Sequence, residues 1–184
     1  MSNASSAELP KIVDPYRLAE HNSVLEGEIP LSALSRFRET VLGFEDDAVC
    51  RVKLSFYMDG ERRRIVSGEL EAPVRLECQR CMESMDSMLV SRFVLGLVTS
   101  DEQAQRLPKD LEPFLTDGFS ADLWSMAEDE LLLVLPPYPL HDRNECPAKE
   151  DLEAFEPGSS SAVPEEKSGE NPFSVLAGLR KTKH

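Results

Sequence analysis

Two stretches of alternating apolar and polar residues meet at a Cys-x-x-Cys motif, and this arrangement limits what the chain can fold into. Before the motif, apolar and polar residues alternate over 74–78, and they alternate again over 89–98. A period of two residues is the period of a β-strand. We therefore place Cys78 and Cys81 in the connection of a β-hairpin. A redox Cys-x-x-Cys of the thioredoxin type instead begins a helix.

The strands around the motif predict an antiparallel sheet. Residues 50–58 form the clearest strand, since their apolar side chains face one way and their polar ones the other. Asp59-Gly60 is a turn signal that leads into a partner strand ending near Glu71, and Ala72-Pro73 separates that strand from the next. Four or five antiparallel strands therefore fall between residues 50 and 98. This number is enough for a curled sheet or a small barrel.

One amphipathic helix follows the sheet. Apolar residues recur at helical spacing from Leu123 to Leu135, Ser120 or Asp122 can cap the start, and Pro136-Pro137 end the pattern. We expect this helix to pack on the sheet, which gives an α+β fold. The three consecutive acids at 128–130 are interpreted as its solvated face.

Composition divides the chain into four parts. Residues 1–11 are predicted to be a disordered lead, 12–155 a single α+β domain, 156–170 an acidic flexible linker and 171–184 a short amphipathic helix. The sequence contains no run of about 18 apolar residues and no secretory signal at its start. With cysteines that have no evident partners, these features predict a cytoplasmic protein without a membrane segment.

The chain carries a formal net charge of −14, which is concentrated in its second half. Residues 101–170 hold 5 Lys and Arg against 18 Asp and Glu. Such a field repels phosphate at long range, so indiscriminate nucleic-acid binding is excluded. Any contact with RNA must therefore come from a local basic patch or through a basic protein partner.

The Cys-x-x-Cys supplies two ligands of a candidate zinc site, and His141 and Cys146 are the candidates for the other two. Their His-x₄-Cys spacing is not that of a second zinc knuckle. A reduced Cys-x-x-Cys that only tightens a turn, with His141 and Cys146 on a solvated loop, is the alternative.

The candidate RNA contacts are arginines near two hairpin turns. Arg62, Arg63 and Arg64 follow the turn at Asp59-Gly60, and Arg80 lies inside the Cys-x-x-Cys. The alternative is a solvated hairpin end whose arginines protect an edge strand from pairing.

The end of the chain combines apolar and basic residues. Phe173, Val175, Leu176 and Leu179 can form one face of a short helix with a basic end, on the far side of the acidic linker. We interpret this segment as a partner-docking peptide. A helix that folds back on its own domain is the alternative.

Several ordered motifs together resemble the YceD family of bacterial proteins, which is named for accumulation of large-subunit ribosomal RNA. They are Leu76 to Cys81, Ser100 to Ala104 with Leu107-Pro108, Asp122 to Pro136, Pro139 to Asp142 with Cys146, and Asn171 to Ala177. The resemblance implies a role in the synthesis, processing or stability of 23S rRNA, and hence in assembly of the large ribosomal subunit.

No Ser/His/Asp, Cys/His or metal-water constellation supports nuclease chemistry in this sequence. We therefore expect a non-enzymatic factor without a small-molecule substrate, which binds precursor rRNA or a ribosome-assembly protein. A zinc-stabilised adaptor that contacts only protein is one alternative. A thiol redox factor that uses the Cys-x-x-Cys is another.

Overall fold

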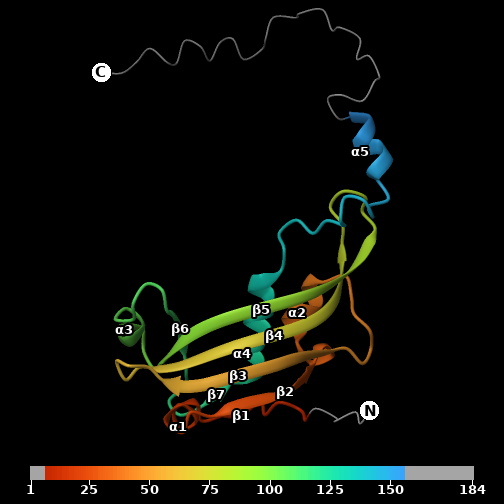
Figure 1. Cartoon of the computed structure of the whole chain (residues 1–184). Coiled ribbons are helices and arrows are strands. Elements are labelled where there is room, and N and C mark those ends of the chain that lie inside the picture. The colour runs from red at the N-terminus through yellow and green to blue at the C-terminus, as the bar shows by residue number, and fades with distance from the viewer. Residues whose placement is uncertain (1–6, 156–184) are drawn as a thin grey trace, which may run out of the picture. The chain divides into compact units, whose positions relative to one another are not determined.

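The computed structural model of the chain describes residues 7–155 and shows a mixed α+β fold (Figure 1). The described residues divide into two units, one over 7–146 and the other over 147–155. The strands are β1 (Ile12–Val13), β2 (Val24–Pro30), β3 (Val49–Met58), β4 (Arg64–Glu77), β5 (Ser84–Val98), β6 (Glu112–Leu115) and β7 (Ala121–Asp122). The helices are α1 (Pro15–Glu20), the 3₁₀ turn η1 (Leu31–Ala33), α2 (Ser35–Thr40), α3 (Asp101–Ala104), α4 (Leu123–Val134) and α5 (Lys149–Phe155).

The principal sheet has five strands in the order β2-β3-β4-β5-β6. The first four are antiparallel neighbours, whereas β6 runs parallel to β5 and pairs only with Leu95–Val98. The predicted antiparallel pairing is confirmed, but only β3, β4 and β5 lie where the sequence predicts four or five strands, because β4 is one long strand and not two. The sheet is open and does not close into the small barrel that was one of the two predicted forms. On its β2 edge, Leu9 N–H donates to Glu28 O and Glu28 N–H donates to Ala7 O, so the chain's own start covers that edge.

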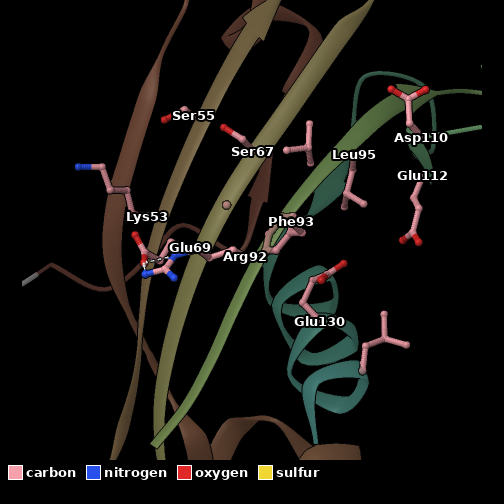
Figure 2. Close-up of a pocket in the computed structure, with 13 residues that line it drawn as sticks. Lys53, Ser55, Ser67, Glu69, Arg92, Phe93, Leu95, Asp110, Glu112 and Glu130 are labelled. Carbon is pink, nitrogen blue, oxygen red and sulfur yellow. Dashed lines mark hydrogen bonds and ion pairs between the residues drawn. The ribbon is translucent and has the colours of Figure 1, made fainter. Parts of the chain in front are cut away.

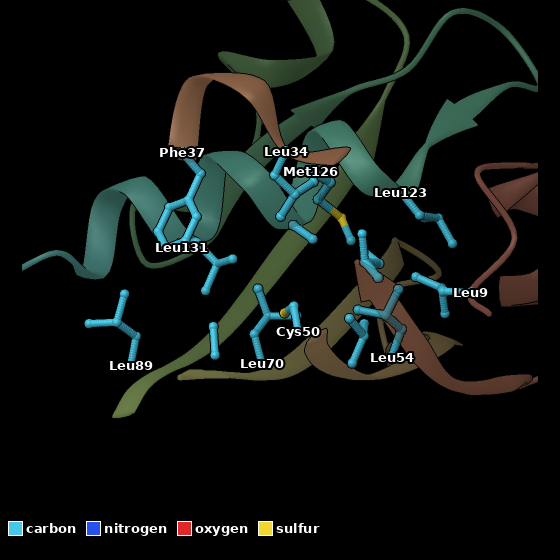
Figure 3. Close-up of a cluster of buried hydrophobic side chains, with 14 of the residues drawn as sticks. Leu9, Leu34, Phe37, Cys50, Leu54, Leu70, Leu89, Leu123, Met126 and Leu131 are labelled. Atoms are coloured by element: carbon cyan, nitrogen blue, oxygen red, sulfur yellow. The ribbon is translucent and has the colours of Figure 1, made fainter. Parts of the chain in front are cut away.

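The hydrophobic core lies between one face of the sheet and helices α2 and α4 (Figure 3). Cys50, Leu54 and Leu70 rise from the sheet and meet Leu131 and Met126 of α4. The side chain of Asp122 accepts hydrogen bonds from the N–H groups of the first turn of α4, which confirms the predicted cap. Burial also raises the pKa of Cys50 to about 12, so this thiol is the core residue that the sequence indicates.

The acidic face predicted for α4 is wrong for two of its three residues. Residues Glu128 and Glu130 are only 7% and 9% exposed. Glu128 accepts hydrogen bonds from the backbone N–H groups of Arg36 and Phe37, at 2.8 and 3.1 Å, and from the Arg36 side chain. Because α2 has no capping side chain of its own, Glu128 satisfies the orphan donors of that helix from 92 residues away.

The predicted strand break at Ala72-Pro73 is also wrong, because β4 runs through both residues. Arg75 exchanges backbone hydrogen bonds with Leu42 and Gly43 on the side away from β5. Strand alternation directs the nitrogen of Pro73 to that same side. The pairing of β3 with β4 ends at Glu71, so no neighbouring strand requires an N–H from Pro73.

Two of the predicted segments fall outside residues 7–155. The linker at 156–170 and the docking segment with Phe173, Val175, Leu176 and Leu179 lie outside the described residues. Among the residues that the structure describes, no helix has the length and apolar character needed to cross a membrane.

Candidate metal centre

The hairpin between β4 and β5 holds Cys78 and Cys81 in a tight turn. Cys78 N–H donates to Glu83 O at 2.9 Å, and Met82 N–H donates to Cys78 O at 2.8 Å. Met82 takes a left-handed conformation with φ of 60°, which reverses the chain within a few residues. The turn therefore brings both sulfur atoms to the same side of the hairpin tip.

The segment after α4 returns to this tip and supplies the other two candidate ligands. Gln79 N–H donates to Pro139 O at 2.9 Å, which fixes the segment against the hairpin. His141 N–H then donates to the Sγ of Cys78 at 3.4 Å. Asp142 accepts from Asn144 N–H and Glu145 N–H, and this turn directs the chain to the buried Cys146.

The structure thus brings together all four residues that the sequence proposes as ligands. The ligand atoms of Cys78, Cys81, His141 and Cys146 lie within 4.8 Å of one another, and the Sγ of Cys81 lies 3.3 Å from Nδ1 of His141. Zinc–sulfur bonds of about 2.3 Å in a tetrahedron require sulfur atoms about 3.8 Å apart. A contraction of about 1 Å or less would satisfy that geometry, so the donor set and its spacing fit a closed Cys₃His zinc site.

The hydrogen bonds around the sulfur atoms favour the thiolate form of one cysteine, Cys78. Burial raises the pKa of the Cys78 thiol, but N–H groups of Cys81, His141 and Arg80 directed at its sulfur outweigh burial and lower the pKa to about 5. Burial and the neighbouring sulfur atoms of Cys78 and Cys146 raise the pKa of Cys81. The thiolate form of Cys78 is therefore favoured at neutral pH, whereas Cys81 would need a nearby positive charge, such as a metal ion, to lose its proton.

The arginines proposed as RNA contacts lie at both ends of β4. Arg62, Arg63 and Arg64 stand at the β3–β4 turn, whereas Arg80 lies at the β4–β5 turn. These turns are separated by the length of a 14-residue strand, which corresponds to about 45 Å. The structure therefore does not bring Arg80 together with the other three.

Carboxylates already hold two of the three adjacent arginines. Arg63 forms ion pairs with Asp59 and Glu61. Arg64 forms an ion pair with Glu20 and lies over the ring of Tyr16 at 4.9 Å. Arg62 is exposed, with φ of 63°. An RNA phosphate at this turn would have to compete with acidic groups of the protein itself.

Two structural roles had no signal in the sequence. Glu128 caps a helix that is distant along the chain, and the carbonyl of Pro139 anchors the ligand-bearing segment. The run of prolines at 136–139 indicates an extended segment, but it does not say what that segment touches.

Comparison with known proteins agrees with the resemblance seen in the sequence. A family model described as large ribosomal RNA subunit accumulation protein YceD matches residues 66–180, a range that contains the whole candidate metal centre. A curated protein of Haemophilus influenzae with the same name is 35% identical over 174 residues, which cover 94% of this chain and 96% of that protein. No solved structure matches the chain.

Proposed function

Because the chain belongs to the YceD family of large ribosomal RNA subunit accumulation proteins, we propose that it is a non-enzymatic factor in the accumulation of 23S rRNA during large-subunit assembly. The observation that carries this proposal is the match to a curated relative over nearly the full length of both chains. The role covers synthesis, processing or stability of the RNA.

The candidate metal centre supports a binding role. Its four donors lie within 4.8 Å of one another and are enough to fill the four positions of a structural zinc, which uses protein ligands at all of them. A catalytic zinc keeps one position for water or substrate. We therefore propose that Zn²⁺ is held by Cys78, Cys81, His141 and Cys146, where it would fix the hairpin tip to the segment after α4.

The thiol redox alternative has weaker support. The lowered pKa of Cys78 suits a nucleophile, but its side chain is fully buried, with 0% exposed. A thiolate that exchanges with a disulfide must be accessible to its partner. The same hydrogen bonds equally suit a metal ligand, because the metal binds the thiolate form.

The charges favour a basic protein over RNA as the direct partner. The chain as a whole repels phosphate, and two of the three adjacent arginines are ion-paired within the protein. Proteins of the large ribosomal subunit must neutralise RNA and therefore attract an acidic factor. Direct binding of precursor rRNA through Arg62, Arg63, Arg64 and Arg80 is the second candidate.

Deletion and replacement of the gene test the proposal. Cells without the protein should contain less 23S rRNA relative to 16S rRNA and fewer large subunits in sucrose gradients. Wild-type protein should restore both, whereas Cys78→Ser should restore them only in part. If the deletion leaves the ratio of 23S to 16S rRNA unchanged, the protein has no role in large-subunit assembly.

A further inference from the structure

One edge of the five-stranded sheet is left unpaired among the described residues. The β2 edge is covered by Ala7–Leu9, and β6 covers β5 only over Leu95–Val98. The first two-thirds of β5 therefore has β4 on one side and no strand on the other. Such an edge is a template for pairing with another chain unless it is blocked.

The hydrogen-bond pattern identifies which groups point outward. Arg75 bonds on the side of β4 away from β5, so the even-numbered residues of β4 bond toward β5. Their partners on β5 are odd-numbered, as in the pair of Ala72 with Leu89. The even-numbered residues Asp86, Met88, Val90 and Arg92 thus direct their N–H and C=O groups to the open edge. Val98 fits the same parity, because its carbonyl accepts from Thr116 beyond the end of β6.

Space is available at the end of this edge that lies nearest β6, beside Arg92. A cavity of about 810 Å³ is lined on the solvent-facing side of the sheet by residues such as Lys53 and Arg92, and on the core side by residues such as Phe93 and Leu95. Its lining continues to α4 and the start of β6 (Figure 2). A cavity that reaches both faces of one strand must pass around the edge of that strand.

The far wall of the cavity is acidic. Asp110, Glu112 and Glu130 line it from the loop before β6, from β6 and from α4 (Figure 2). Within the described part of the chain, Glu112 and Glu130 have no salt bridge to lysine or arginine. Burial first, and then the charges of Glu112 and Asp129, raise the pKa of Glu130, although Ser91 donates a hydrogen bond to it. A cation beside these carboxylates would relieve their repulsion.

The other side of the edge is apolar. Met88, Val90 and Val94 stand on the solvent-facing side of β5, and these residues are 53%, 37% and 48% exposed. The edge thus offers backbone groups in the middle, apolar side chains on one face and carboxylates on the other. A strand that alternates apolar and basic residues matches all three.

We propose that the β5 edge from Asp86 to Arg92 binds an extended basic segment of a partner protein, which adds to the sheet as a further antiparallel strand. The apolar residues of the segment lie beside Met88 and Val90, and its lysines or arginines face Glu112 and Glu130. A second copy of this chain is disfavoured, because pairing two β5 edges would bring the same carboxylates together in a protein of net charge −14. The inference deepens the proposed function, and rests on it only in placing the partner among large-subunit proteins.

The test uses the full chain and a peptide of about ten residues that alternates valine and arginine. In an antiparallel pair, opposite residues share a face, so the valines donate their N–H groups to β5 while the N–H groups of the arginines point outward. N-methylation of the valines should abolish binding measured by calorimetry, whereas N-methylation of the arginines should preserve it. Replacing the arginines by glutamates should also abolish binding.

Hydrogen exchange locates the peptide on the sheet. Amides of Met88, Val90 and Arg92 should exchange at least tenfold more slowly when the peptide is present, while those of Leu89 and Ser91 are already protected by β4. Asp110→Lys with Glu112→Lys should weaken peptide binding at least tenfold. Glu8→Lys with Glu39→Lys makes the same change in charge at two exposed positions, the first of them at the opposite, β2 edge of the sheet, and should leave the affinity within about twofold.

Several results would overturn the proposal. They are equal binding of both N-methylated peptides, no binding at millimolar concentration, and a dimer of the free protein in which the same β5 amides are already protected. The proposed function is judged separately. If Asp110→Lys with Glu112→Lys loses the peptide but restores 23S rRNA in deletion cells, the edge binds a partner that assembly does not need. If deletion leaves 23S rRNA unchanged, the assembly role fails while the edge is still decided by the peptide.

Discussion

The two hairpin turns at opposite ends of β4 look equally functional in the sequence, but they differ in what the fold places beside them. The β3–β4 turn gathers three consecutive arginines, and its neighbours Asp59, Glu61 and Glu20 pair with two of them. The β4–β5 turn offers only two cysteines, and the fold brings His141 and Cys146 to them from about 60 residues away.

The difference shows that a dense local cluster is not by itself a site. Surface arginines attract carboxylates from nearby in the sequence, as with Asp59 and Glu61, and from farther away, as with Glu20. These pairs leave little free charge for a ligand. Four ligands from two distant segments, in contrast, meet only if the fold requires it. The cysteine turn is therefore the better candidate for a functional or stabilising centre.

The largest effect should come from removing a ligand at the cysteine turn. Cys78→Ser should abolish stoichiometric zinc, measured by elemental analysis of the purified protein. It should also lower the melting temperature by about 10 °C or more, because the binding energy of a structural zinc contributes directly to folding. Cys50→Ala is the matched control, since it removes a buried thiol from the core and should leave the zinc content unchanged. If the purified protein contains no metal and melts at the same temperature with and without a chelator, Cys78 and Cys81 only stabilise a turn.

A smaller effect is expected at the arginine turn from Asp59→Asn. The side chain of Asp59 accepts hydrogen bonds from the backbone N–H groups of Glu61 and Arg63 and from Nε of Arg63. We expect the melting temperature to fall by a few degrees at pH 7, with no change in metal content.

The effect of Asp59 should depend on pH in one direction. Burial acts to raise the pKa of this carboxyl, but its bonds to Arg63 and Glu61 outweigh burial and lower the pKa below the usual 3.8. A lowered folded-state pKa gives stability that is present above the unfolded pKa and is lost as the pH falls through the folded one. The difference between Asp59→Asn and wild type should therefore be constant above about pH 5 and vanish in more acidic solution. A difference that grows in acid would contradict the assigned bonds.

The smallest effect should be on the salt dependence of RNA binding. If Arg62, Arg63 and Arg64 each held a phosphate, changing all three to Ser would reduce the salt slope for a 23S rRNA fragment by about two to three. Because Arg63 and Arg64 are already ion-paired, we expect a reduction of about one or less. The control changes Arg38, Arg51 and Arg106, which are exposed and lie outside this turn. If the salt slope falls by about two to three in the Arg62, Arg63 and Arg64 variant and not in the control, the β3–β4 turn contacts the RNA.

The sequence predicts the local elements of the fold well, since they depend on near neighbours. The period-two patterns give β3 and β5, and Asp122 marks the start of α4. Sequence reasoning failed at Pro73 and at Glu128. Proline usually ends a strand, and its tolerance here depends on where β3 happens to stop. A glutamate on an amphipathic helix usually faces water, and its burial here depends on a second helix that lacks a cap.

The candidate sites divide in the same way. The residue types and the hairpin placement of the Cys-x-x-Cys followed from the sequence, as did the family, because both depend on residue identity and order. Tertiary structure alone decided that His141 and Cys146 reach the two cysteines, that the arginines are paired, and that β6 stops short and leaves part of β5 unpaired. Contacts between residues far apart in the chain depend on how the helices and strands pack against one another. Alternation and spacing along the chain do not predict that packing.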